Sequence, residues 1–327
     1  MAKGIAIVCV VIGHCVAVGS PAKRLIYTFH MPLFFILAGC TFRLRPFGEE
    51  LRRSSARLLA PYALLFLVGP VKDALGRAPS VSGIDFAALA RSLAGGSGFD
   101  MPDGTARVGI AWFLAALFCA RLLMCLLGHL FARTHAPRAA QGAACVAVGA
   151  VGLAIGSGLG IWLPLSLDVA MVAVPIMWFG MVARSLGLPL IDAGGGEGAR
   201  GAARSIALAG ACLALWALAY RFADMDMADR LYRLPALALV GALAATYAIC
   251  AACRVLDRVA PAVERPLARL GRLSFLILCV HAVDWVIPWT YLPLLDGLPH
   301  PNLVAGLLRT AYCVAWAELA ARVAPRG

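Results

Sequence analysis

Long apolar runs separated by short polar segments dominate the pattern of the chain. A helix that crosses a bilayer needs about 20 mostly apolar residues, and about ten runs approach that length. We expect transmembrane helices near residues 4–19, 25–42, 56–71, 108–130, 141–160, 169–186, 204–220, 234–251, 270–288 and 303–321. The pattern therefore predicts an all-α, polytopic integral membrane protein with about ten transmembrane helices and one domain over residues 1–327.

Composition supports this interpretation. The chain is 62% hydrophobic and 14% charged, whereas a soluble domain is about half apolar and about a quarter charged. The apolar excess is too large for one globular core, so a bilayer is its natural solvent. The first run has no convincing small-residue cleavage site and further runs follow it, so we interpret it as a helix and not as a signal peptide.

The charges predict an orientation. If the N-terminus is cytoplasmic, 18 of the 29 Lys and Arg residues fall in inside segments and 9 fall outside, while Arg121 and Arg309 lie within the apolar runs. Such an asymmetry is typical of a bacterial inner-membrane protein, here with both termini in the cytoplasm. Because orientation explains most of the net charge of +12, we do not expect nucleic acid as a partner.

The segments between the runs suggest no separate soluble domain. Residues 72–107 are predicted to be external, with a short interfacial helix at 84–94, and residues 187–204 are predicted to be a flexible cytoplasmic linker. The eleven cysteines lie in or beside apolar runs, so we expect no disulfide framework. The pair Cys250 and Cys253 has no second pair to complete a zinc site, and we expect no metal.

Two polar residues stand out in the first run. Lys3 and His14 are eleven residues apart, which places them on one helical face about 16 Å apart along the axis. Lys3 would then lie at the cytoplasmic headgroups and His14 near the middle of the bilayer. An ionisable residue at that depth normally faces a protein interior or a water-filled cavity, and histidine can exchange a proton near neutral pH. The alternatives are a structural histidine between helices and a snorkelling lysine.

Further polar residues lie in or beside the other runs. His281 and Asp284 are three residues apart on one helical face, either as a functional pair or as an internally satisfied one. His30 precedes Pro32, which suggests a local bend and a structural role as the alternative. Asp168 begins the sixth run and is either an N-cap or a site residue.

The remaining charges are less specific. Arg53 and Arg57 could hold an anionic ligand or only lipid headgroups. Arg309 and Glu318 are either interfacial or paired. The chain has no P-loop, GxSxG elbow or HExxH motif. The residues alone therefore describe a membrane enzyme or a proton-coupled carrier with an internal histidine site.

Several segments together resemble the acyltransferase 3 family of membrane acyltransferases. KGIAIVCVVIGH (3–14) and FHMPLFFILAGCTFR (29–43) resemble its N-terminal signature, in which a basic residue precedes a histidine by ten intervening positions. RLLAPY, WFLAALF, LPLSLDVAMVAVPIMWFGMVAR, DMDMADRLYRLP and LARLGRLSFLILCVH follow in family order. FHMPLFF with LPLSLD is most similar to the fucose 4-O-acetylase-like branch. Ala38 and Leu273 stand where relatives often carry Ser and Asn, and relatives usually have an Asp two residues before the lysine and further residues upstream. Whether Met1 is the natural start is left open.

The resemblance implies an O-acetyltransferase. Acetyl-CoA would be the cytoplasmic donor substrate, with no tightly bound cofactor, and the acceptor would be a hydroxyl of a sugar or surface glycan. The oligomeric state is left open. The catalytic candidates are His14, as general base or acyl acceptor, and Lys3. The substrate-binding candidates are His30, Arg43, Arg53, Arg57, Trp112, Asp168, Asp226, His281 and Asp284. A transporter of a polar or lipid-linked solute is the alternative.

Overall fold

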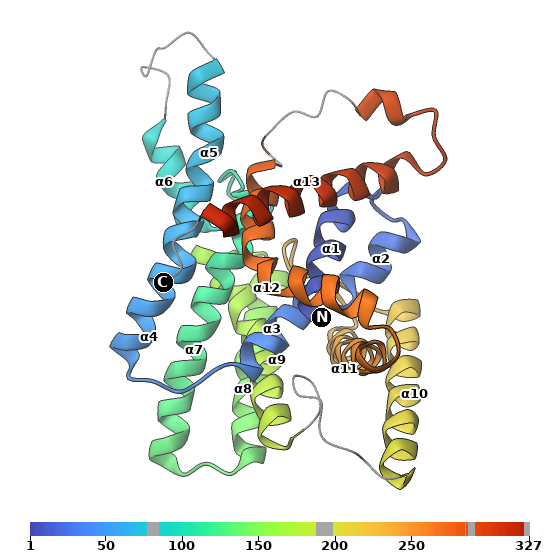
Figure 1. Cartoon of the computed structure of the whole chain (residues 1–327). Helices are drawn as coiled ribbons and strands as arrows, with labels where there is room; N and C mark the ends of the chain where they lie inside the picture. Colours follow the sequence, from blue (N-terminus) through green and yellow to red (C-terminus); the bar gives the residue numbers. More distant parts are fainter. Residues whose placement is uncertain (77–84, 188–198, 285, 287–291, 324–327) are drawn as a thin grey trace. The chain divides into compact units, whose positions relative to one another are not determined.

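A computed structural model gives the structure of the chain and describes residues 1–76, 85–187, 199–284, 286 and 292–323 (Figure 1). The side chains of residues 72–76, 199–205 and 292 are outside this description. Helices make up nearly all the regular structure of the described residues. The first seven are α1 (Ala2–Cys15), α2 (Pro21–Tyr27), α3 (His30–Cys40), α4 (Phe47–Ser54), α5 (Ala60–Gly76), α6 (Phe86–Gly95) and α7 (Trp112–Thr134). The others are α8 (Arg138–Leu153), α9 (Leu167–Ser185), α10 (Ala199–Phe222), α11 (Pro235–Val259), α12 (Pro261–Asp284) and α13 (Pro301–Val323).

The described residues contain seven helical segments that are long and apolar enough to cross a membrane. They are Phe47–Val71, Gly109–Thr134, Arg138–Gly158, Pro164–Ser185, Pro235–Val259, Pro261–Asp284 and Pro301–Val323. Ala2–Cys15 and Ile206–Phe222 are apolar helices of shorter length. The prediction of an all-α, polytopic membrane protein is therefore confirmed, while the cytoplasmic location of both termini stays a prediction.

Two of the predicted runs are shorter or broken in the structure. The first helix ends at Cys15 because Val16 is extended, with φ −73° and ψ 149°. The run at 25–42 divides into α2 and α3, since the Thr28 hydroxyl donates to the Leu25 carbonyl at 2.6 Å at the end of α2. Pro32 fits the first turn of α3, where a missing N–H does not break an intrahelical bond. These breaks place His14 and His30 at helix ends.

The chain folds into two compact units, which we describe separately. Unit 1 comprises Met1–Cys40, Phe179–Met225 and Tyr232–Gly327, and unit 2 comprises Thr41–Trp178 and Asp226–Leu231. In unit 1, α1 packs against α12 and α13 (Figure 1). The core between α1, α3 and α11 contains Ala6, Phe29, Leu33, Leu37, Ala245, Ile249 and Cys253. Gly4 brings α1 close to the backbone of α12, because a Cβ there would overlap the Leu267 carbonyl oxygen.

Unit 2 contains α4 to α8 and the first part of α9. A π-helical turn at Ser55–Leu59 connects α4 and α5. The expected short helix near 84–94 is present as α6: the Asp85 carboxylate accepts from the Ala88 amide at 2.8 Å, and Gly96 ends it with φ +63°. The predicted linker at 187–204 lies mostly outside the described residues, and its last part belongs to α10.

The described residues contain one two-stranded sheet, formed by β1 (Asp224–Asp226) and β2 (Leu231–Arg233). None of the eleven cysteines, all of which are described, forms a disulfide, as expected.

Candidate functional site

Two histidines from opposite ends of the sequence meet in unit 1. His14 lies in the last turn of α1, and His281 lies in the last turn of α12. His14 Nδ1 is 2.9 Å from His281 Nε2, and the two rings are stacked with centroids 5.2 Å apart. His281 is fully buried and His14 is partly exposed. The structure thus joins two residues that the sequence pattern had only marked separately.

A carboxylate and an arginine continue this pair. Asp284 Oδ2 is 3.5 Å from His281 Nδ1, one helical turn further along α12. Arg309 of α13 donates from Nε to Asp284 Oδ2 at 2.9 Å and from a terminal nitrogen to the Asp284 main-chain carbonyl at 3.3 Å. Both side chains are buried. The order is therefore Arg309, Asp284, His281 and His14, from the most buried charge pair to the partly exposed imidazole.

The order of partners determines which ring nitrogens carry protons. An ionised carboxylate only accepts hydrogen bonds, so Asp284 favours the proton on His281 Nδ1. His281 Nε2 is then an acceptor, and His14 must donate to it from Nδ1. A neutral His14 in this tautomer has its lone pair on Nε2. The geometry therefore prepares His14 Nε2 to accept a proton or to attack an electrophile.

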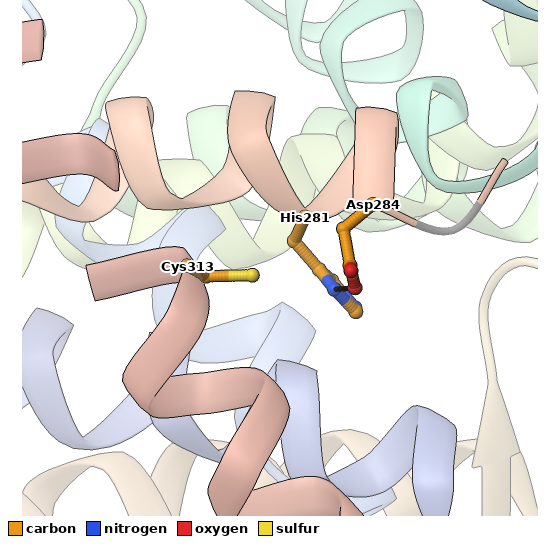
Figure 2. Close-up of side chains that lie close together, drawn as sticks. All are labelled: His281, Asp284 and Cys313. Carbon is orange, nitrogen blue, oxygen red and sulfur yellow. Dashed lines mark ion pairs between the residues drawn. The ribbon is translucent and has the colours of Figure 1, made fainter. Parts of the chain in front are cut away.

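Cys313 of α13 lies beside His281 and Asp284 (Figure 2). One possible ligand atom from each of His281, Asp284 and Cys313 lies within 4.8 Å of the other two, and all three residues are buried. Imidazole, carboxylate and thiolate together suit zinc. Arg309, however, already neutralises Asp284 and donates to its Oδ2. We therefore interpret this cluster as the group that determines which ring nitrogens of the two histidines carry protons.

A second group of side chains lies near His14 at the start of α3. His30 is buried, and its Nδ1 donates to the Ile26 carbonyl at 2.9 Å. The Tyr27 ring centroid is 4.7 Å from that of His30, and the Lys23 ammonium lies 5.1 Å from the Tyr27 centroid. Lys23 and His30 are both within electrostatic range of His14. His30 therefore lies in the surroundings of His14 and lines the same site.

Lys3 lies at the other end of α1. The helix is uninterrupted over Ala2–Cys15, so Lys3 and His14 keep the eleven-residue spacing predicted for one face, about 16 Å along the axis. Lys3 is half-buried, and its Cβ is 3.6 Å from where a Cβ on Gly271 of α12 would stand. The structure therefore places Lys3 far from His14, so the two residues cannot act on the same atom.

Asp168 belongs to unit 2 and has a partner within the protein. It is the second residue of α9, and its Oδ1 accepts from the Leu163 amide at 3.2 Å. Arg230 pairs with it, Nε lying 2.9 Å from Asp168 Oδ2. The N–H groups of Arg230 also bond Ser97, Ser166 and the Ala228 carbonyl, so that its five donors form five bonds. The side chain of Asp168 joins loops of unit 2; a role in binding substrate stays a prediction.

One of the three predicted phosphate-binding arginines lies beside an acidic residue. Arg53 lies 3.4 Å from Glu49, while Arg43 and Arg57 are exposed. Arg53 lies in α4, and Arg57 lies in the π-helical turn that follows it. Their predicted phosphate contacts remain predictions.

A buried acidic group that sequence reasoning missed lies in the same region. Glu50 is fully buried; it accepts from Arg121 Nε at 2.8 Å and from the Ser54 hydroxyl at 2.8 Å. Arg45 lies 3.6 Å from its other oxygen. A signal existed, because Arg121 interrupts an apolar run and requires a buried counter-charge.

The last two substrate-binding candidates, Trp112 and Asp226, are also in unit 2. Trp112 is buried and packs over Gly98, where a Cβ would lie 2.8 Å from the indole. Asp226 accepts from the amides of Ala228 at 3.0 Å and of Asp229 at 3.3 Å, which closes the turn between β1 and β2. Both residues therefore have a structural explanation, and their binding roles stay predictions.

The two charges of the tenth run are both paired. Arg309 bonds Asp284, as described above, and Glu318 forms an ion pair with Arg269 of α12. The sequence left open whether these residues are interfacial or paired, because their partners lie in another helix. Arg309 and Arg230 are the residues that sequence analysis undervalued most.

Comparison with known proteins identifies the family. The sequence pattern of the acyltransferase 3 family, described as an acyltransferase domain, matches residues 1–318 of the 327 and so extends over both units. No curated protein matches the chain, and no solved structure does. The match decides between the enzyme and the carrier that the sequence analysis left open. The chain belongs to the acyltransferase 3 family and is a multi-pass membrane acyltransferase.

Proposed function

We propose that the protein transfers an acetyl group from cytoplasmic acetyl-CoA to a hydroxyl of a sugar or surface glycan. The observation that carries this proposal is the hydrogen bond between His14 and His281, which Asp284 and Arg309 continue. The arrangement supplies an imidazole with a fixed tautomer, as acyl transfer to a hydroxyl requires. The family match supports an acyl group as the group that is transferred.

The donor end of the site is assigned to Lys3. Acetyl-CoA carries several phosphates, and cations bind them through charge-assisted hydrogen bonds. Lys3 is half-buried at the first turn of α1. About 16 Å of helix separates it from His14, a span suited to the extended pantetheine arm. Arg43, Arg53 and Arg57 are further candidates for the phosphates.

Two chemical routes fit the histidine. In the first, the acceptor hydroxyl attacks the thioester carbonyl while His14 Nε2 takes its proton; the C–S bond breaks, and the CoA thiolate leaves and is protonated by the imidazolium. In the second, Nε2 attacks the thioester carbonyl, the C–S bond breaks, and the CoA thiolate leaves and takes up a proton. The acceptor hydroxyl then attacks the acetyl carbon, the C–N bond breaks, and the hydroxyl proton that is released balances the proton taken up by the thiolate. In both routes His281 accepts from His14 Nδ1 and stabilises the positive charge that develops on the ring.

The test is transfer from radiolabelled acetyl-CoA by the purified full chain. We expect His14→Asn to lose transfer, whereas His135→Asn, the same substitution at an exposed position outside the site, should retain it. Full transfer by His14→Asn would exclude the proposed chemistry. Acetylated protein that accumulates without acceptor, with ping-pong kinetics, would identify the second route; its absence with sequential kinetics would identify the first.

Lys3 gives a separate test of the donor end. Lys3→Ala should raise KM for acetyl-CoA about tenfold, the loss expected for one charge-assisted contact. Lys3→Arg keeps the charge and should be milder. Equal and complete loss in both variants would show that Lys3 acts other than through its charge.

The acceptor and the membrane are proposed from the resemblance and from the pattern of charges. The resemblance to the fucose 4-O-acetylase-like branch suggests a sugar acceptor, and the charge asymmetry suggests a bacterial inner membrane. A comparison of glycan acetylation in cells with and without the gene would test the acceptor. Unchanged glycan acetylation would exclude a glycan acceptor.

A further inference from the structure

A lysine on α2 contacts an aromatic ring that packs beside the reacting histidine. Lys23 is half-buried, and its ammonium lies 5.1 Å from the centroid of the Tyr27 ring. No residue in the described part of the chain forms an ion pair with it. A cation over an aromatic face is attracted by about 1 kcal/mol, which holds the ammonium in place without neutralising it.

The other cations of this region are neutralised. Arg24, the next residue on α2, lies 3.2 Å from Asp224 and stacks over the Tyr220 ring at 5.4 Å. Arg309 is paired with Asp284 at 2.9 Å. Burial weakens the hydration of a charge, so a half-buried cation gains from an anionic partner. Lys23 therefore differs from its neighbours in the way expected of a residue whose partner is a ligand.

The position of Lys23 relates it to the reaction. Tyr27 packs against α1 beside His14, since a Cβ on Gly13 would lie 3.4 Å from the Tyr27 ring. The same ring lies 4.7 Å from that of His30. The ammonium is within electrostatic range of both His14 and His30. An anionic group bound to Lys23 would therefore lie in the surroundings of His14, as would a sugar that carries this group.

We propose that Lys23 and Tyr27 form an acceptor subsite that binds an anionic group, so that the acceptor is an acidic or phosphate-bearing sugar. This inference rests on the proposed function and narrows its substrate class. The ammonium of lysine is a compact point charge that binds a carboxylate or a phosphate without a fixed fork geometry. The Tyr27 ring holds this ammonium beside α1 and His14.

Binding to the purified full chain in neutral detergent tests the subsite. The probes are methyl β-D-glucuronide, glucose 1-phosphate and the neutral methyl β-D-glucoside, each measured by isothermal titration calorimetry. The wild type should bind at least one anionic probe about 10- to 100-fold more tightly than the neutral one, the range for a hydrogen bond to a charged group. The glucuronide and the phosphate distinguish the two sources of the charge.

Three variants test whether Lys23 is responsible for this preference for anionic probes. Lys23→Gln should abolish it and Lys23→Arg should retain part of it. Arg24→Gln removes the same charge from the adjacent position of α2 and should leave the preference intact. No preference in the wild type, including no detectable binding, would overturn the inference, as would an unchanged preference in Lys23→Gln. Loss of the preference on adding phosphatidylglycerol would reassign Lys23 to lipid headgroups and also overturn it.

Transfer assays separate this inference from the proposed function. If the wild type prefers anionic probes but transfers no acetyl group, the subsite stands and the proposed function fails. If it acetylates the neutral glucoside as well as the glucuronide, and Lys23→Gln does the same, the proposed function stands and the subsite fails.

Discussion

The replacement of Asp284 by Asn tests the tautomer argument most directly. Asn keeps the size of Asp, but only one of its two terminal atoms is an acceptor, whereas Asp284 Oδ2 faces both Arg309 Nε and His281 Nδ1. When the NH₂ group takes the place of Oδ2, it is a donor, so His281 Nδ1 must become the acceptor. His281 would then donate from Nε2 to His14 Nδ1, which reverses the 2.9 Å hydrogen bond between the rings. His14 Nε2 would carry the proton and could neither accept one nor attack.

The expected loss has two separate parts. For transfer, the wrong tautomer in a triad of this kind lowers kcat about 10⁴-fold, and we expect a loss of at least 10²-fold, the lower range for general base catalysis. For stability, the substitution leaves Arg309 buried without its counter-charge, which costs about 3–5 kcal/mol for a buried ion pair. Arg309 is 8% exposed and Asp284 is fully buried, so solvent screens little of this charge.

A double variant separates these parts. Arg309→Met removes the orphaned charge and keeps the length of an unbranched side chain. Replacing a buried ion pair by apolar or neutral groups of similar size is often neutral or stabilising. The double variant Asp284→Asn with Arg309→Met should therefore recover much of the thermal stability that each single variant loses. It should not recover transfer, because the carboxylate that selects the tautomer is still absent.

The assay combines thermal unfolding in detergent with acetyl transfer at a temperature where all four proteins are folded. Recovery of stability together with transfer would refute the argument, because Asp284 would then matter only as a counter-charge. Loss of neither property in Asp284→Asn would refute it as well. Retained stability with lost transfer in the single variant would still support the tautomer role and would show that Arg309 tolerates the amide.

The other predictions concern packing and access. Arg230→Lys should lower stability by about 3 kcal/mol, since three donors cannot replace five buried ones, whereas Arg233→Lys, 66% exposed, should be neutral in thermal unfolding. Gly180→Ala should destabilise unit 1 by at least about 1–3 kcal/mol, because its Cβ would overlap the Ile36 carbonyl. Gly210→Ala, with open space around it on α10, should instead stabilise by up to about 1 kcal/mol. Val18→Cys, at a position 88% exposed, should react with a membrane-impermeant maleimide above the background of the native cysteines; no added labelling would count against access from water.

The apolar pattern predicted the membrane helices well because it reports a property local to each segment. Each of the ten predicted runs overlaps at least one helix of the structure. It predicted their ends less well, because the ends depend on single residues. The first helix stops at Cys15 and not at residue 19, since Val16 is already extended, and the chain then turns at Gly19 with φ +79°. Apolar residues such as Ala17 and Val18 gave no sign of that turn.

The candidate site could be predicted residue by residue but not as a set of contacts. His14, His281 and Asp284 were identifiable because ionisable residues are rare in apolar runs. Their order was not, since the His14–His281 contact spans 267 positions and no local period relates them. Arg309 lies in the tenth run, and its pairing depends on how α12 and α13 pack. Burial of Asp284 makes such a cation necessary, but several arginines could have supplied it.

The short first helix suggests how the two substrates meet. The 14 residues of α1 rise about 21 Å, less than the ~30 Å thickness of the hydrocarbon core. If Lys3 lies at the cytoplasmic headgroups, as proposed, α1 ends inside the membrane, and His14 lies close to its middle. Ala17, Val18 and Gly19 continue there as exposed, non-helical backbone. Such backbone is tolerated at that depth only where protein or a water-filled cavity covers it. A cavity open to the far side would meet this condition, and through it a polar acceptor would reach the same imidazole that the donor approaches from the cytoplasm.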